Sequence, residues 1–210
     1  MVIFTGDFET HITVSLNNED KITALQRWGI DHGLSFLHIV LERGKTISQP
    51  MLTLHGQGDF DNELRQAMEL AATLKAADFS VARVKIEAVL GNRGIPQDHL
   101  EALNQHQHIN SYFEHHIKLM LESDVDISSL VELATRHSAH LSRNAWRVCD
   151  HNRVERFVTQ RCRSISQVAA REQLEKLLDE IRALAHPIIK VEEEFVLYDN
   201  NLAIDDGWLQ

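Results

Sequence analysis

The sequence predicts an α+β fold: a tandem duplication of a ferredoxin-like βαββαβ unit with two antiparallel sheets whose polar faces form a cleft or barrel. Two observations lead to this prediction. Phe8-Glu9-Thr10-His11-Ile12 aligns with Phe113-Glu114-His115-His116-Ile117 at an offset of 105 residues. In both halves, apolar residues also alternate between strand spacing and helix spacing in the same order. We therefore expect two structurally similar halves in one chain.

The first repeat, residues 1–92, contains the clearer elements. Alternating apolar residues indicate half-buried strands, and apolar residues three and four positions apart indicate amphipathic helices. In chain order the sequence predicts a strand over 8–16, a helix over 22–28, strands over 36–42 and 51–55, a helix over 60–74 and a strand over 81–90. On the strand over 36–42 we expect Leu37, Ile39 and Leu41 to lie beneath the helices.

The second repeat, residues 111–210, follows the same order and includes a C-terminal tail. The sequence predicts a strand over 113–121, a helix over 127–134, strands over 141–148 and 154–162, a helix over 168–184 and a strand over 188–198. The pattern does not fix which faces of the strands over 141–148 and 154–162 point inward. Between the repeats, residues 93–110 contain Gly94, Pro96 and a polar run, which predicts a linker. We expect Trp208 and Leu209, in the tail, to pack on a neighbouring element.

Each predicted sheet has helices on one face, and charged side chains alternate onto the other face. In the ferredoxin-like order the first and last strands are neighbours, so His11 is expected beside Lys85 and Glu87, and His116 beside Lys190 and Glu192. We interpret four residues as acid–base or catalytic candidates: His11, His116, Glu87 and Glu192. The ligand-binding candidates are Glu9, His38, His55, Lys85, Glu114, Arg143, Arg161 and Lys190. The alternative is that an exposed sheet face is polar for solubility alone.

A basic cluster in the second half favours an anionic ligand. Six arginines lie within 21 residues: Arg143, Arg147, Arg153, Arg156, Arg161 and Arg163. Guanidinium groups bind phosphate and carboxylate, so we expect the partner to be a small anionic molecule. Histidine and carboxylate side chains meeting across the two faces would also suit a divalent metal, but the sequence leaves metal ligands and cofactors unknown. A solvent-exposed hairpin is the alternative reading of the arginines.

Composition limits the class of protein. The chain has 21 Lys and Arg against 31 Asp and Glu, a net charge of −10, which argues against binding nucleic acid by bulk charge. No apolar run is long enough to span a membrane, and the first residues lack the pattern of a signal peptide. Cys149 and Cys162 suit a reducing compartment better than a disulfide. We therefore expect a cytoplasmic protein that binds neither membranes nor bulk nucleic acid, and composition leaves its oligomeric state open.

Three known families share single features with the chain. His11-Ile12-Thr13 and His140-Leu141-Ser142 resemble the His-x-Ser/Thr motifs of two-histidine phosphoesterases, but the aligned equivalent of the first reads His116-Ile117-Lys118. The run Lys190-Val191-Glu192-Glu193-Glu194 is similar to the charged strands of triphosphate-tunnel enzymes, whose N-terminal Glu-x-Glu-x-Lys is absent here. Vicinal-oxygen-chelate proteins look alike in placing His on the first strand and Glu on the last, but their modules lack the second helix.

The sequence thus supports two hypotheses about function. In the first, two charged sheet faces bind a small phosphorylated or carboxylated ligand, with a metal-assisted phosphohydrolase, acting on phosphate esters or polyphosphate, as the enzymatic form. In the second, the chain is a non-catalytic ligand-sensing or protein-interaction module whose polar faces are solvated, because fold alone carries no activity.

Overall fold

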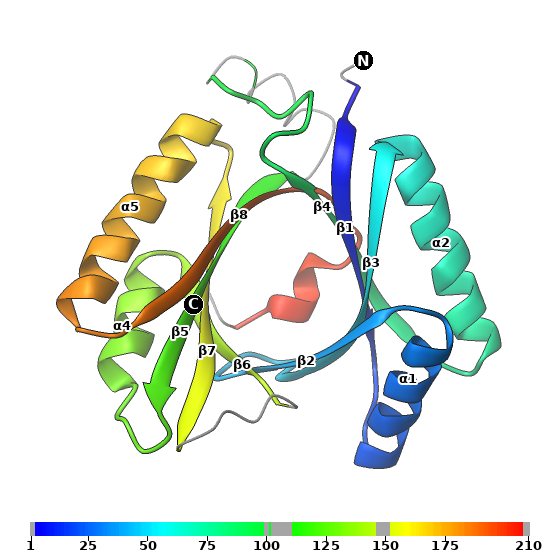
Figure 1. Ribbon diagram of the computed structural model, residues 1–210, viewed down its shortest axis with the longest axis horizontal. Helices are drawn as coiled ribbons and strands as arrows, with labels where there is room; N and C mark the ends of the chain where they lie inside the picture. Colours follow the sequence, from blue (N-terminus) through cyan, green and yellow to red (C-terminus); the bar gives the residue numbers. More distant parts are fainter. Residues whose placement is uncertain (1–2, 99–100, 102–110, 146–151, 208–210) are drawn as a thin grey trace.

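The computed structural model describes residues 3–98, 101, 111–145 and 152–207. Eight strands close into one barrel, with four helices against its outer surface (Figure 1). The first half contains β1 (Thr5–Val14), α1 (Glu19–Asp31), β2 (Ser35–Leu41), β3 (Ser48–Asp59), α2 (Phe60–Ala76) and β4 (Val81–Val89). The second half contains β5 (Tyr112–Glu122), α4 (Ser128–Arg136), β6 (Ala139–Asn144), β7 (Arg153–Arg163), α5 (Gln167–Ala183) and β8 (Ile188–Asp199), followed by a short 3-10 helix, η1 (Leu202–Asp205).

The strand order around the barrel is β1-β3-β2-β6-β7-β5-β8-β4. Within each half the order is that of a ferredoxin-like sheet, with the first strand between the last and the third. The halves meet at two antiparallel seams, β2 with β6 and β4 with β8. The expected α+β fold with antiparallel strands is therefore present. The expected two sheets are instead one closed sheet, because each half joins its edge strands to those of the other.

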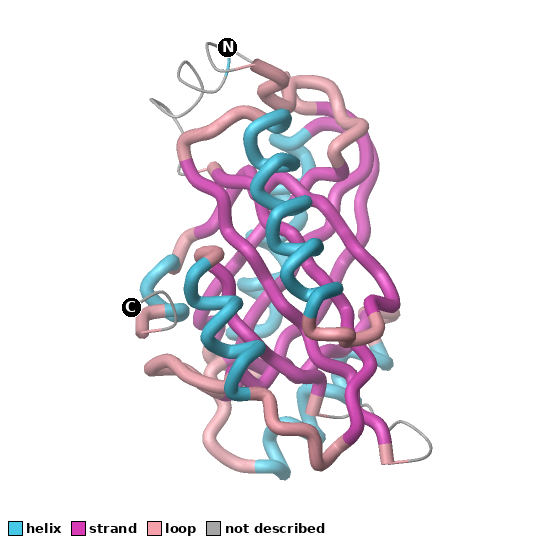
Figure 2. The backbone as a smooth tube through the Cα atoms, turned by 90° about the vertical axis from the view of Figure 1, so that its left-hand side faces the viewer, coloured by secondary structure: helices cyan, strands magenta, loops and turns pink. Residues whose placement is uncertain are grey.

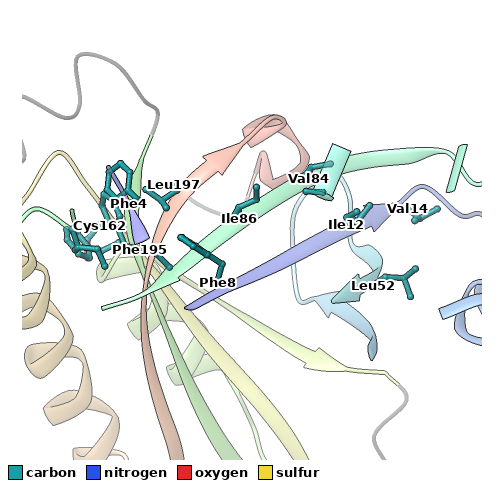
Figure 3. Close-up of a cluster of buried hydrophobic side chains, with 14 of the residues drawn as sticks. Phe4, Phe8, Ile12, Val14, Leu52, Val84, Ile86, Cys162, Phe195 and Leu197 are labelled. Atoms are coloured by element: carbon teal, nitrogen blue, oxygen red, sulfur yellow. The ribbon is translucent and has the colours of Figure 1, made fainter. Parts of the chain in front are cut away.

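Two apolar layers lie between the barrel and the helices. In the first half, α1 and α2 cover Phe8, Ile12, Leu52 and Ile86, part of the cluster in Figure 3. In the second half, buried residues of α4, α5 and strands β5 to β7 form a similar layer; its members include Ile117, Leu130, Leu133, Leu177 and Ile181. The side view in Figure 2 shows helices running along the outside of the strands. These layers bury the apolar faces of the helices. Helix packing therefore does not need the inside of the barrel, which can carry polar groups.

The helix ends follow local rules. Asn18, Asp59 and Ser166 each accept a backbone N–H at the start of α1, α2 and α5. His32 and His137 end α1 and α4, and the His32 Nδ1 lies 2.8 Å from the Trp28 carbonyl oxygen. Within the described part of the chain, every helix is too short or too polar to cross a membrane.

The facing of β2 differs from the sequence prediction. Leu37, Ile39 and Leu41 line the inside of the barrel, whereas we expected them beneath the helices. His38, expected on the polar face, is instead buried with its Nε2 2.9 Å from the Ser48 Oγ. The prediction failed because it assumed that the apolar side of every strand faces a helix, and this strand is apolar towards the barrel interior.

The predicted linker 93–110 and the tail lie partly outside the described residues, as do Arg147, Cys149, Trp208 and Leu209. Cys162 is buried, and burial raises the pKa of its thiol to about 12, which agrees with an inert thiol. The repeat boundaries at residues 92 and 111 and the cytoplasmic location stay predictions.

Candidate functional site

A cavity of about 270 Å³ lies inside the barrel, close to the lower end of the range of small-molecule pockets. Its lining is divided into two parts. The charged wall consists of Glu9, His11, Arg83, Lys85, Glu114, His116, Lys118, Arg161, Glu192 and Glu194, contributed mostly by β1, β4, β5 and β8. The apolar wall consists of Leu37, Ile39, Leu41, Met51 and Phe157 from β2, β3 and β7. The strand order places β2 across the barrel from β8, so charged and apolar groups face each other.

His11 is held between a hydroxyl group and two carboxylates. Its Nδ1 lies 2.9 Å from the Thr53 Oγ1 on the paired strand β3. Its Nε2 lies 3.0 Å from the Glu87 Oε2 and 3.5 Å from the Glu9 Oε1. The His11 side chain is 13% exposed, so the cavity reaches it. The ring is therefore oriented by Thr53 and presents Nε2 to the carboxylates.

His116 has the same kind of surroundings on the other half. Its Nδ1 lies 3.0 Å from the Thr159 Oγ1, and its Nε2 lies 3.4 Å from the Glu114 Oε1 and 3.3 Å from the Glu194 Oε2. Burial alone would lower the pKa of His116, but the hydrogen bonds and negative charges of Glu114 and Glu194 raise it well above its ordinary value. The surroundings of His116 therefore favour its protonated form.

Glu87 connects the two histidines. Besides its contact with His11, its Oε1 lies 3.9 Å from the His116 Nε2. Burial raises the pKa of Glu87, but the nearby Lys85 ammonium outweighs burial and holds the pKa well below its ordinary value. Burial and the charge of Glu87 raise the pKa of Glu194, so this second carboxyl group is the readier of the two to hold a proton. The two histidines and two carboxyl groups thus form one cluster of neighbouring titratable groups.

Glu87, Glu114 and His116 have the spacing of a metal site, with ligand atoms within 4.8 Å of one another. The Lys85 Nζ, however, lies 2.8 Å from the Glu87 Oε1 and 2.6 Å from the Glu114 Oε1. Burial opposes the charge on Lys85, but Glu114 and Glu87 raise its pKa. The ammonium group is therefore already the cation of this cluster, and a divalent metal would have to displace it.

One end of the cavity is occupied by an arginine cluster. Arg83 donates to Asp199 through Nε (2.9 Å) and Nη2 (2.5 Å). Arg161 donates from Nε to the Glu114 Oε2 (2.6 Å) and lies over the ring of Tyr112. Asp205, from η1, accepts from both arginines. Figure 1 shows η1 inside the ring of strands, which explains how the tail reaches this position.

The two halves differ by two residues in the register of their last strands. Glu9 lies opposite Glu87 on β4, whereas Glu114 lies opposite Glu194 on β8. The sequence places His116 beside Glu192, and these two residues do lie opposite each other on β5 and β8, but the alignment of Glu87 with Glu192 does not show the side-chain contact with Glu194. Glu192 lines the cavity and pairs with Lys190 at 2.5 Å, but Glu194 is the carboxylate that contacts His116.

Several predicted residues do not meet in the cavity. His38 and Arg143 are absent from the residues that line it, and Arg143 is exposed. His55 is at the rim, with its side chain 68% exposed and its Nδ1 4.0 Å from Glu9. The described arginines of the basic cluster are also dispersed, because Arg156 pairs with Glu42 while Arg161 is buried inside the barrel. They do not form a single anion-binding patch.

Sequence reasoning missed Asp205, whereas strand alternation places Thr53 and Glu194 on the polar faces and Thr159 among the hydrogen-bond donors of its strand. The two threonines have a usable signal, since each lies on a strand next to a Glu-x-His strand and alternates onto its polar side. Asp205 has none, because it lies in a short irregular tail whose path depends on the complete barrel.

The chain matches no family model and no curated protein. Among solved structures, it is similar to the acetolactate synthase small subunit from Thermotoga maritima, with a TM-score of 0.31 and 13% identity over 92% of this chain and 97% of that one. It is also similar to the chlorite dismutase from Candidatus Nitrospira defluvii, with a TM-score of 0.26 and 9% identity over 98% and 96%. At these scores the likenesses carry no argument about function.

Proposed function

We propose that the barrel binds a small molecule with an apolar body and a polar head group that can exchange a proton. The observation that carries the proposal is the division of the cavity into a charged wall and an apolar wall. Apolar groups of a ligand gain free energy against Leu37, Ile39 and Phe157, whereas its head group finds donors and acceptors around His11 and His116.

The head group meets groups suited to acid–base chemistry. His116, whose surroundings favour its protonated form, lies 3.3 Å from Glu194, whose pKa is raised, so the pair can donate a proton. His11 lies 3.0 Å from Glu87, whose lowered pKa keeps it a carboxylate that can accept a hydrogen bond from the ring. Acid and base groups side by side on the charged wall, within reach of a ligand head group, support an enzymatic role for the four residues. The same geometry would serve a sensor that binds without reaction.

The charge balance favours a neutral or cationic head group. In the described part of the cavity lining, every lysine and arginine already pairs with a carboxylate. Among these pairs, Lys85 is bound by Glu87 and Glu114 and not by Glu9 or Glu194. A phosphate or carboxylate must therefore compete with an existing ion pair, and the cavity gives no support for phosphate-ester or polyphosphate hydrolysis. The anionic ligand stays a second candidate because Arg83, Lys85 and Arg161 gather at one end.

We also infer that the two halves derive from one duplicated unit. The repeated strand order, the two Glu-x-His strands and the two His–Thr contacts support this inference. Duplication of one unit accounts for the presence of one Glu-x-His strand with its His–Thr contact in each half.

The ligand class can be tested with three probes that share a six-carbon skeleton and differ in the head group: hexylamine, hexanol and hexanoate. We expect hexylamine and hexanol to raise the melting temperature of the wild type more than hexanoate does, because the lysines and arginines are already paired. Ile39→Asn, in the apolar wall, should abolish the shift for all three, and His11→Ala with His116→Ala should reduce the shift for hexanol most, because its hydroxyl group loses its hydrogen-bond partners.

Ile189→Asn is the matched control, since Ile189 is 53% exposed and lies outside the cavity lining. The proposal fails if no probe shifts the melting temperature, or if Ile39→Asn and Ile189→Asn respond as the wild type does. A larger shift with hexanoate than with hexylamine would instead favour the anionic candidate.

A further inference from the structure

The short helix η1 places a carboxylate of the C-terminal segment inside the barrel. Asp205 is 8% exposed, and three donors converge on it. Arg83 donates from Nη1 (3.0 Å) and Arg161 from Nη2 (2.8 Å) to the same oxygen, Oδ2, while Gln49 donates from Nε2 (3.0 Å) to Oδ1. These donors come from β4, β7 and β3, which lie far apart in the chain.

The convergence has the geometry of a carboxylate-binding site. Each guanidinium keeps a carboxylate partner of its own from a strand, Asp199 for Arg83 and Glu114 for Arg161. The remaining N–H groups of both arginines point to one position, where their positive charge lowers the pKa of Asp205 despite its burial. Asp205 also lines the cavity, so this position is continuous with the space that holds a ligand.

Besides Asp205, the described residues of the C-terminal segment contact the barrel through Asn201, whose Nδ2 donates to the Ala82 carbonyl oxygen at 2.8 Å, and through Asp206. Lys45 and Asp206 form an ion pair with side chains 75% and 49% exposed, and the Lys45 N–H donates to the Asp206 carbonyl oxygen at 2.9 Å. Ile204 is buried, but Ala203 is exposed. Surface ion pairs of this kind contribute little free energy, so Asp205 itself is a main attachment of η1.

We propose that Arg83, Arg161 and Gln49 form a binding subsite for a small carboxylate, and that Asp205 occupies it as an internal ligand. A carboxylate-bearing small molecule takes the same position when η1 leaves it. This explains why arginines gather in a cavity whose described cations are all paired. One of their carboxylate partners, Asp205, belongs to the C-terminal segment, and a ligand carboxylate can replace it. The subsite lies at one end of the cavity, and Glu114 links its Arg161 to His116.

The test is to empty the subsite and refill it with acetate. Asp205→Ala should lower the melting temperature, because Arg83 and Arg161 lose a shared partner in a buried place. Sodium acetate should then restore the melting temperature in a saturable way, whereas sodium chloride at equal ionic strength should not. In the wild type, where Asp205 competes, acetate should bind at least about tenfold more weakly.

Two variants serve as controls. Asp206→Ala removes the exposed neighbour and should behave as the wild type does in acetate. Asp205→Asn keeps the shape of the side chain but removes its charge, so it should be destabilised and should gain less from acetate than Asp205→Ala, because the amide still fills the position.

The proposal is overturned if Asp205→Ala melts as the wild type does, or if acetate stabilises all variants equally. If Asp205→Ala does not fold without additives, refolding yields in acetate and in chloride decide the question, and equal yields count against the subsite. None of these outcomes depends on the hexyl probes, so the proposed ligand of the main cavity can fail while the subsite holds, or the reverse.

Discussion

The two walls of the cavity differ in what holds them in place. The charged wall is a network in which Lys85 is shared by Glu87 and Glu114, and Glu114 is shared by Lys85 and Arg161. The apolar wall is a row of separate side chains, such as Leu37 and Ile39, that face the cavity without specific partners. A change in the charged wall should therefore unbalance several groups at once, whereas a change in the apolar wall should act locally and mainly on binding.

The strongest test of this difference is Lys85→Met. The substitution keeps the apolar stem but leaves Glu87 and Glu114 as two buried carboxylates without their shared cation, which should destabilise the fold by about 3–5 kcal/mol. Urea unfolding followed by circular dichroism measures the loss. Lys190→Met is the control, since Lys190 pairs with Glu192 at a site where its side chain is 58% exposed, and a loss below about 1 kcal/mol is expected there. Equal losses would contradict the network.

Lys85→Met also tests whether Glu87, Glu114 and His116 can bind a divalent metal. With the ammonium group gone, the place between Glu87 and Glu114 is open, and added Zn²⁺ or Mn²⁺, which would bind His116 in its neutral form, should recover part of the melting temperature. The wild type should show no such shift at the same metal concentration. A shift in the wild type as large as that in the variant would mean that a metal displaces Lys85.

A smaller effect is expected from pH through His116. The pKa of His116 is raised in the folded state, so its contribution to stability is complete below the unfolded pKa of about 6.5 and is lost as pH rises through the folded value. The stability difference between the wild type and His116→Gln should therefore narrow from about pH 6 to about pH 9. Glu87 and Glu114, whose pKa values are lowered, stay charged throughout this range. A constant difference would show that His116 does not titrate with folding.

The smallest effect lies where the two walls meet. Lys118 Nζ lies 5.3 Å from the centre of the Phe157 ring and 3.5 Å from the Glu155 Oε2. A double-mutant cycle with Phe157→Leu and Lys118→Met should give a coupling energy of about 0.5–1 kcal/mol. A coupling energy near zero would mean that the charged and apolar walls are independent even at their boundary.

The division between a charged and an apolar wall also explains which cavity residues could be predicted from the sequence. On β1, β4 and β5 the interior side is charged and the helix side is apolar, so alternation alone places His11, Lys85 and Glu114 in the cavity. On β2 both sides are largely apolar, and alternation cannot tell the barrel interior from a helix-covered face. The helices and strands were predictable because apolar spacing is a local property.

The remaining errors come from relations between distant parts of the chain. The contact of Glu194 rather than Glu192 with His116 depends on a two-residue difference in strand register, which an ungapped alignment cannot show. The position of Asp205 depends on donors from three strands. Closure into one barrel depends on pairing between halves, and no local pattern in either half specifies it.

The two seams between the halves have a consequence for synthesis of the chain. Until β6 and β8 exist, β2 and β4 end the first half as open edges, and its charged interior side faces water. During synthesis the edges of the first half stay unpaired until the second half is made. At high concentration these edges can pair with the second half of another molecule. Interlocked dimers with exchanged halves are the characteristic misassembly of such an architecture, and dilution during refolding should suppress them.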